Sequence, residues 1–301
     1  MIIDDPSTLK KQYKNYRNYL NIDISNKSVD EIHSKYQISI FYFVKNFINF
    51  RIKSKIKCIR IKENSKKESI IYLEFKEKYN IESFKIYKLL KMYSINLKYD
   101  LLYLQIKKNI IETINKKKEL EEFVLNIKFP LMFNCFSRVN MNIFNLLYSK
   151  IYSNLNINTN KLTCFGRDVL IPANLSFNNF KKIDIICHNL DIINLSKSYN
   201  PYIPTHYIKK NLYHTYLEQN NLDNSSIYIS SSKKGLSTTF IKNLLKIRNL
   251  NLLIIWCNYE LMKRDVSILL DNNFKIKNIE YFDEHPCTNK NNLSTLINFI
   301  I

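Results

Sequence analysis

A cysteine directly follows one of the most apolar runs of the chain. Residues 252–256 predict a buried strand, Cys257 comes next, and residues 260–270 have the spacing of an amphipathic helix. Active sites of α/β proteins gather at the carboxyl ends of strands, and amides at a helix start favour the thiolate. Cys257 is therefore a candidate nucleophile. The alternative, which composition alone favours, is a plain buried cysteine.

The other cysteines and the histidines indicate no metal site and no disulfide framework. No C-x-x-C pair and no zinc spacing occurs among the cysteines at positions 58, 135, 164, 187, 257 and 287. We assign no role to His188, His206, His214 or His285, which also lack metal spacing.

The part of the chain after Pro130 alternates short apolar runs with helical segments. The runs predict strands, and the segments between them, such as residues 238–247, predict helices. This alternation indicates a parallel α/β sheet, with residues 293–301 as a buried terminal strand. The predicted strands cover residues 183–186, 227–229, 252–256 and 276–282.

The first part of the chain has a different pattern. Residues 7–20 predict a short basic helix, and residues 44–62 and 68–75 predict antiparallel strands around a polar break. Residues 97–106 are strand-like, and the charged stretch 110–124 predicts a helix. We therefore expect a small basic α+β domain over residues 1–128 and an α/β domain over residues 129–301.

The charge of the chain points to a polyanionic partner. Lys and Arg number 46 against 26 Asp and Glu, so the formal net charge is +20. Such an excess favours salt-dependent binding of nucleic acid. Charge alternates with apolar residues from Arg51 onward, so Arg51, Lys53 and Lys55 would share one strand face that contacts phosphates. The alternative is a solvated sheet face without a ligand.

Several motifs, in order, resemble those of the RNA (uracil-5)-methyltransferases, which make 5-methyluridine in tRNA and rRNA. Residues 136–140, Phe-Ser-Arg-Val-Asn, resemble the family's Phe-Phe-Gln-Val-Asn, and residues 162–172 resemble its cofactor loop, with Cys164 and Pro172 at the family's spacing. Residues 230–236, Ser-Ser-Ser-Lys-Lys-Gly-Leu, resemble Asp-Pro-Pro-Arg-x-Gly-Leu, and Cys257-Asn258 matches the Cys-Asn signature. The resemblance implies a class I, Rossmann-like methyltransferase sheet and S-adenosylmethionine as the cofactor of an active enzyme.

The reaction that the resemblance implies needs a nucleophile and a base. Uracil C5 is a poor nucleophile, so a thiolate first adds to C6, C5 then takes the methyl group, and a base removes the C5 proton. The resemblance casts Cys257 as the thiol. The family's base glutamate falls on Asn292, whose amide is not competent for this step.

The positions that would bind uracil and the cofactor have also changed. Among the substrate-binding positions, Arg138 replaces a glutamine, Ser230 replaces an aspartate and Asn140 is kept. In the cofactor loop, Phe165 and Arg167 stand where the family has glycines, and Gly166 is displaced by one residue. The acidic residue that holds the ribose falls on Cys187. Cys164, Gly166 and Cys187 would thus form a degraded cofactor pocket.

These departures together favour an RNA-binding protein with a methyltransferase fold that no longer transfers methyl groups and holds no cofactor. It would bind tRNA or rRNA, as a subunit of an RNA-processing or ribonucleoprotein assembly. One alternative is an active uracil-C5 methyltransferase that uses Cys257. Another is a structural or partner-stimulating subunit that does not bind RNA. Without a membrane-length apolar run or an export signal, we expect an intracellular protein, in the cytoplasm or an organelle.

Overall fold

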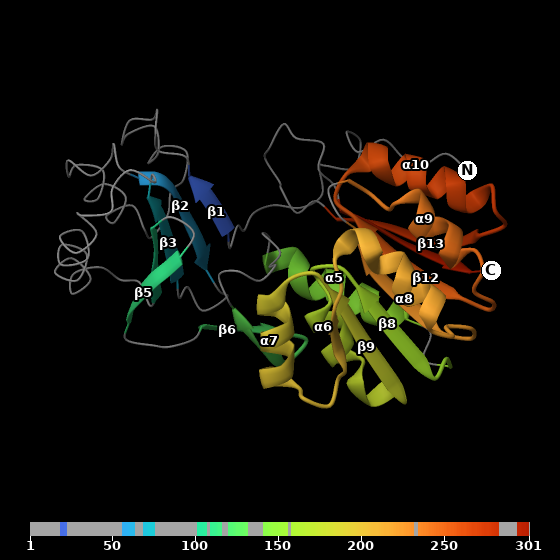
Figure 1. Ribbon diagram of the computed structural model, residues 1–301, viewed down its shortest axis with the longest axis horizontal. Helices are drawn as coiled ribbons and strands as arrows, with labels where there is room; N and C mark the ends of the chain where they lie inside the picture. Colours follow the sequence, from blue (N-terminus) through green and yellow to red (C-terminus); the bar gives the residue numbers. More distant parts are fainter. Residues whose placement is uncertain are drawn as a thin grey trace. The chain divides into compact units, whose positions relative to one another are not determined.

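The computed structural model describes ten segments of the chain (Figure 1). They are residues 19–22, 56–63, 69–75, 101–106, 109–115, 120–131, 141–155, 158–231, 234–282 and 294–300. These segments form two compact units, one within residues 17–123 and 128–133 and the other within residues 124–127 and 134–301. The domain boundary that we predict after residue 128 lies inside a strand, β7 (Ile127–Leu131).

The first unit contains a five-stranded sheet in the order β1-β2-β3-β4-β5. Its strands are β1 (Tyr19–Ile22), β2 (Ile56–Glu63), β3 (Ser69–Phe75), β4 (Leu101–Ile106) and β5 (Asn109–Asn115). Strands β2 and β3 are antiparallel, as the polar break between them predicts, whereas β3 and β4 are parallel. A separate two-stranded sheet joins β6 (Leu120–Val124) to β7.

For the first part of the chain, one sequence prediction is wrong and another is wrong at its end. Of residues 110–124, the described residues 110–115 lie in β5 and 120–124 form β6, because β-branched residues at 110, 111, 113 and 114 favour a strand over the charged neighbours. The predicted helix 7–20 cannot include its last two residues, since Tyr19 begins β1. The rest of that helix lies outside the described residues.

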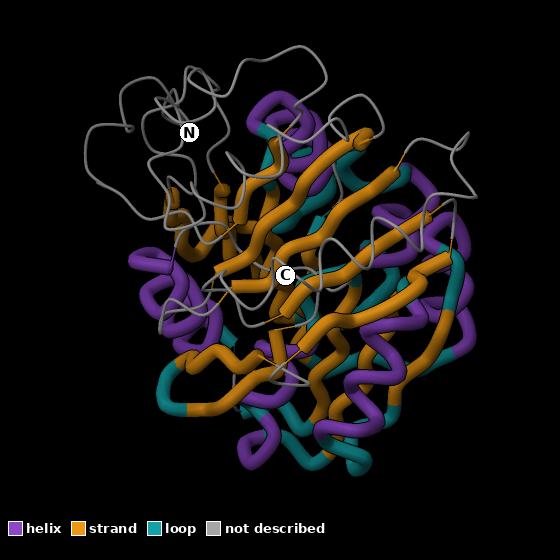
Figure 2. Tube along the Cα trace, turned by 90° about the vertical axis from the view of Figure 1, so that its left-hand side faces the viewer, coloured by secondary structure: helices purple, strands orange, loops and turns teal. Residues whose placement is uncertain are grey.

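The second unit contains a seven-stranded sheet in the order β10-β9-β8-β11-β12-β14-β13. Strands β8 to β12 run parallel, and in Figure 2 the strands lie side by side with helices on both sides of the sheet. They are β8 (Lys161–Phe165), β9 (Lys182–Cys187), β10 (Thr205–Tyr207), β11 (Ser226–Ser230), β12 (Asn251–Trp256), β13 (Lys275–Phe282) and β14 (Ser294–Ile300).

The prediction of an α/β sheet is confirmed, but the sheet is mixed and not purely parallel. The four predicted apolar runs lie within β9, β11, β12 and β13, and the terminal run forms β14. Strand β14 inserts between β12 and β13 and is antiparallel to both. An apolar run tells that a strand is buried on both faces, but it does not tell the strand's direction.

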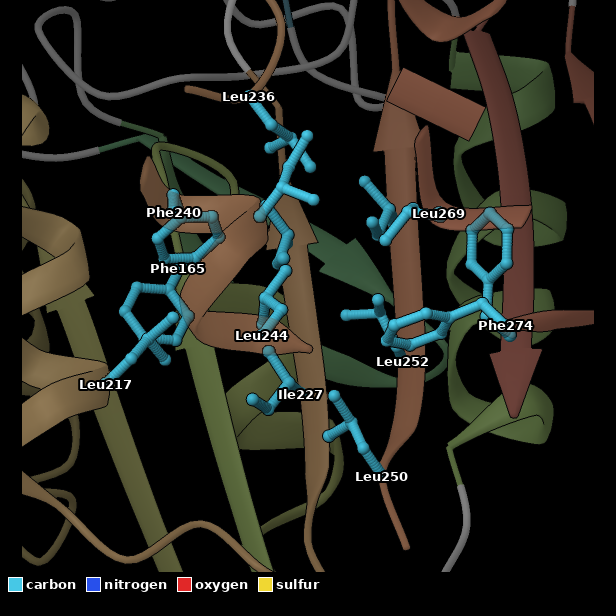
Figure 3. Packing of buried hydrophobic residues seen from close by; sticks show 14 of the residues in the cluster. Phe165, Leu217, Ile227, Leu236, Phe240, Leu244, Leu250, Leu252, Leu269 and Phe274 are labelled. Carbon is cyan, nitrogen blue, oxygen red and sulfur yellow. The ribbon is translucent and has the colours of Figure 1, made fainter. Parts of the chain in front are cut away.

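Helices cover both faces of this sheet. Helices α8 (Tyr213–Gln219), α9 (Thr238–Leu244) and α10 (Tyr259–Leu270) pack on one face, and Figure 3 shows their leucines and phenylalanines against strand residues such as Ile227 and Leu252. Since successive strand residues point to opposite faces, Tyr228 points to the other face. On that face its hydroxyl donates to the carboxylate of Asp168, which also accepts a hydrogen bond from Tyr148 of α5 (Met141–Asn154).

The remaining helices are α6 (Leu170–Leu175), α7 (Leu190–Tyr199) and two short 3₁₀ turns, η3 (Phe177–Asn179) and η4 (Lys210–Leu212). Among the described residues, the structure has no helix with the length and apolar character needed to cross a membrane.

Candidate functional site

Four of the predicted site residues meet at the carboxyl edge of the seven-stranded sheet. Gly166 follows β8, Cys187 ends β9, Ser230 ends β11, and Cys257 follows β12. Strand pairing fixes this arrangement, because Phe165 is in register with both Ile186 and Ile229. The edge where parallel strands end is the usual ligand site of such folds.

Gly166 makes the turn after β8 and has a positive φ of 119°. Its N–H donates to the carbonyl of Ile186 at 3.1 Å, which ties the turn to β9. A Cβ at this position would collide with the carbonyl oxygen of Ser230, and L-residues rarely adopt this φ. The displaced glycine therefore provides the backbone freedom that this turn needs.

The phenylalanine before this glycine points into the core. Phe165 is fully buried, and its ring contacts those of Tyr213, Tyr216 and Phe240 at centroid distances of 5.3–5.8 Å. Burial of such a ring contributes about 1.5–3 kcal/mol to folding. Phe165 thus belongs to the packing between β8 and helices α8 and α9, while the exposed residue of the turn is Arg167.

The two predicted cofactor-site cysteines are buried. Cys164 and Cys187 are both 0% exposed, and burial raises the pKa of each thiol. For Cys164 the neighbouring carboxylates of Asp168 and Asp184 raise the pKa further. The Sγ of Cys187 accepts a hydrogen bond from the Asn189 N–H at 3.3 Å. Neither thiol offers a charged group to the edge.

Basic side chains gather beside the end of β9. Arg167 Nε donates to His188 Nε2 at 3.4 Å, and His188 Nδ1 lies 2.8 Å from the Tyr213 hydroxyl. The pKa of His188 is lowered by burial and by the charges of Arg167 and Lys210. The pKa of Lys210 is lowered by burial and by the charges of Arg167 and Lys234. Positive charges are therefore concentrated where the family resemblance requires an acid.

Cys257 is exposed and stands at the start of α10. The next residue, Asn258, caps this helix, because its Oδ1 accepts a hydrogen bond from the Leu261 N–H at 3.1 Å. The alternative of a plain buried cysteine is thus wrong for Cys257. An accessible thiol at a helix start fits a nucleophile.

A buried aspartate on α10 holds the loop after β11. Asp265 Oδ2 accepts hydrogen bonds from the Leu236 N–H at 2.8 Å and from the Trp256 indole at 3.0 Å. Arg264 bonds the other oxygen of Asp265 and the Leu236 carbonyl. These contacts position residues 234–236 against the strand that carries Cys257.

The structure describes only part of the predicted site. Arg51, Lys53, Lys55, Arg138, Asn140 and Asn292 lie outside the described residues, so their roles stay predictions. Sequence reasoning missed His188 and Lys210. His188 directly follows an apolar strand, as Cys257 does, so the same rule could have identified it. Lys210 follows the end of β10 by three residues, but the sequence predicts no strand at residues 205–207, so no pattern marks it.

Comparisons with known proteins confirm the resemblance to RNA methyltransferases. An uncharacterized RNA methyltransferase of Mycoplasma mobile is 25% identical over 169 residues, which are 54% of this chain and 45% of that protein. The matched part thus spans about half the length of this relative. No protein-family model matches the chain.

Solved structures confirm the fold. The tRNA (uracil-54, C5)-methyltransferase of Pyrococcus abyssi, in complex with S-adenosyl-L-homocysteine, matches with a TM-score of 0.68 and 14% identity, over 94% of this chain and 75% of that one. A candidate SAM-dependent methyltransferase of Streptococcus mutans matches with a TM-score of 0.56 and 10% identity, over 92% and 82% of the two chains. The sheet thus has the same Rossmann-like fold as the sheets of these two proteins.

Proposed function

We propose that this protein binds RNA through an RNA methyltransferase-like fold and does not transfer methyl groups. The similar proteins named above include an RNA methyltransferase and a tRNA methyltransferase, and the net charge of +20 favours a polyanion. The intended partner is tRNA or rRNA. A role as a subunit of an RNA-processing assembly is part of the same proposal.

The proposed loss of methyl transfer rests on the residues at the carboxyl edge of the seven-stranded sheet. Strand β9 ends in a buried cysteine followed by His188, and Arg167 lies beside that histidine. A ribose diol is held by a carboxylate that accepts its hydroxyl protons, whereas a guanidinium has no acceptor. A cationic edge also repels the sulfonium of S-adenosylmethionine. The amide at Asn292, in place of a base, supports the same proposal.

Two titrations test this function. RNA affinity is measured by fluorescence anisotropy with a tRNA transcript at low salt, and cofactor affinity by calorimetry with S-adenosylmethionine and S-adenosylhomocysteine. We expect RNA binding that weakens with salt and no cofactor binding at micromolar concentration. Absence of RNA binding at low salt contradicts the proposal and favours the structural or partner-stimulating alternative. Micromolar cofactor binding contradicts the loss of methyl transfer.

Two observations favour a second candidate, an active uracil-C5 methyltransferase. Cys257 is exposed at the end of β12, and Gly166 keeps the positive φ of the turn after β8. Incubation with 5-fluorouracil-containing RNA and S-adenosylmethionine separates the two candidates. An active enzyme becomes covalently trapped through Cys257, and a Cys257→Ser variant does not. We expect no trapped complex with either protein.

A further inference from the structure

The turn after β8, the end of β9 and the start of η4 bring three basic side chains to one edge of the sheet. Arg167 is exposed, and its Nε donates to His188 Nε2 at 3.4 Å. Because Nε2 accepts this bond, the proton of the neutral ring sits on Nδ1, which donates to the Tyr213 hydroxyl at 2.8 Å. Lys210 stands three residues after the end of β10, which pairs with β9, and the Ile208 N–H donates to the Cys187 carbonyl at 3.0 Å. The segment that carries Lys210 is therefore tied to the end of β9 beside His188, and the charge of Arg167 acts on both His188 and Lys210.

This cluster is not neutralised within the part of the chain that the structure describes. Neither Arg167 nor Lys210 forms an ion pair with an acid among the described residues. The acid next to Arg167 in sequence, Asp168, is 4% exposed and accepts hydrogen bonds from the hydroxyls of Tyr148 and Tyr228. The carboxylate of Asp168 is therefore bound to these tyrosines in the interior and forms no ion pair with Arg167.

The positive charges of Arg167 and Lys210 repel one another, and an anion bound between them offsets this repulsion. The donors match phosphate better than a neutral sugar, because a guanidinium and an ammonium offer several N–H groups and no acceptor. Two exposed side chains, one aromatic and one aliphatic, are close to His188 in strand register or in sequence. Tyr207 is 49% exposed and in register with Cys187, and Leu190, two residues after His188, is 58% exposed. Such side chains give a base a surface to stack on.

We propose that the edge formed by Arg167, His188 and Lys210 is a binding site for the phosphate group of a nucleotide. The phosphate comes either from an RNA chain or from a free nucleotide. This site goes beyond the proposed function, because phosphate binding at this edge does not depend on the RNA affinity of the whole protein. It also gives the edge a ligand that is not the adenosyl cofactor.

Calorimetry with the full chain tests the site. Adenosine 5′-monophosphate, inorganic phosphate, adenosine and S-adenosylmethionine are titrated separately at constant ionic strength and pH 7.5. We expect the monophosphate to bind at least about 10-fold more tightly than adenosine, since only the former carries the charged group. Equal affinity for the two, or binding of S-adenosylmethionine alone, overturns the proposal.

Variants locate the site on the protein. Arg167→Gln and Lys210→Gln each remove one charge and are expected to weaken monophosphate binding at least about 10-fold. The matched control is Lys277→Gln, because Lys277 is exposed and lies on β13 at the opposite edge of the sheet. This substitution should not change the affinity for the monophosphate. An equal loss in all three variants means that bulk charge alone binds the phosphate, and the proposal fails.

A measurement on the unaltered protein keeps the proposal testable if a variant does not fold. Phosphate bound beside the ring raises the pKa of His188, which is followed by NMR titration of the histidine resonances with and without phosphate. We expect one histidine to shift, and a His188→Gln protein to lack that resonance. An unchanged set of histidine pKa values overturns the site.

An RNA arm distinguishes the source of the phosphate. If Lys210→Gln lowers the affinity for a short RNA by the same factor as the affinity for the monophosphate, and the monophosphate competes with RNA, the phosphate bound at this site belongs to RNA. If only the monophosphate is affected, the ligand is a free nucleotide. RNA binding without any monophosphate binding, and unaffected by Arg167→Gln or Lys210→Gln, overturns this inference but leaves the proposed function intact.

Discussion

The turn after β8 depends on Gly166. With φ at 119° and the carbonyl oxygen of Ser230 only 2.4 Å from where a Cβ would stand, a side chain is excluded both by conformation and by space. We expect Gly166→Ala to lower the free energy of unfolding by about 1–3 kcal/mol. Urea denaturation measures this, with Asn249→Gly as a control, because that exposed residue also has a positive φ and tolerates glycine. Equal stability of Gly166→Ala and the parent would show that the turn can relax.

His188 makes the stability depend on pH. Its folded pKa is lowered by burial, Arg167 and Lys210, so between that value and 6.5 the unfolded chain binds a proton that the folded protein does not. Stability is therefore lost as pH falls from about 6.5 to the folded pKa and is fully present above 6.5. Thermal unfolding across this range should show a smaller acid loss for His188→Gln. His206, which lies 3.6 Å from Asp184, stays in both proteins and cancels in the comparison.

The exposure of Cys257 predicts selective alkylation. In the native protein, iodoacetamide should modify Cys257 more than about 100-fold faster than Cys164 or Cys187, which are fully buried and have raised pKa values. Peptide mass spectrometry over time gives the three rates separately. In denaturant the three rates should converge. Comparable rates in the native protein would mean that Cys257 is covered.

At the scale of the elements, apolar runs predicted the strands correctly, whereas a charged stretch led to the wrong prediction of a helix. The runs in β9, β11, β12 and β13 are bounded by polar residues, so their limits are visible in the sequence. Residues 110–124 were predicted as a helix because their charges resemble a solvated helix surface, and the β-branched residues of β5 decided otherwise. The antiparallel insertion of β14 depends on pairing between distant residues, which no local pattern contains.

In the candidate site, too, features with a local sequence pattern could be predicted, and features that depend on contacts between distant residues could not. Cys257 could be predicted, because it directly follows a strand that the sequence predicts, and Gly166 could be identified from the resemblance of residues 162–172 to the family's cofactor loop. The effect of Arg167 on the pKa of Lys210 could not be predicted, since it depends on how the chain after β10 is placed relative to the turn after β8. The hydrogen bonds of Asp265 to residues on β12 and in the loop after β11 are equally hidden in the sequence.

Asp265 links three elements, and its removal should destabilise all of them. In Asp265→Ala the buried Trp256 indole N–H and the Leu236 N–H lose their acceptor, at a cost of about 1–3 kcal/mol for each unsatisfied group. Denaturation followed by the fluorescence of Trp256, the single tryptophan, reports both the loss and the changed surroundings of the ring. Asp271→Ala, at the exposed end of α10, is the control and should cost less than about 0.5 kcal/mol. A similar effect of both changes would exclude a specific role for Asp265.

At the scale of the whole molecule, the fold and the charge support the proposed RNA partner by independent routes. The sheet order and its matches describe the scaffold of a methyltransferase, whereas the +20 charge describes an attraction that needs no catalytic residue. The proposed function therefore combines affinity for RNA with the loss of methyl transfer. The two properties should separate experimentally, since charge responds to salt and the fold does not.

The salt dependence of RNA affinity gives the number of phosphates that the protein contacts. A protein that neutralises about five phosphates of single-stranded RNA has a slope of log affinity against log salt of about −3.5, so its affinity falls about 100-fold between 50 and 200 mM salt. We expect at least this slope in anisotropy titrations. Lys210→Gln should reduce the slope by about 0.7 if that lysine contacts RNA, whereas thermal unfolding at the same salt concentrations should change little. Affinity that does not respond to salt would contradict a binding mode based on the charge of this chain.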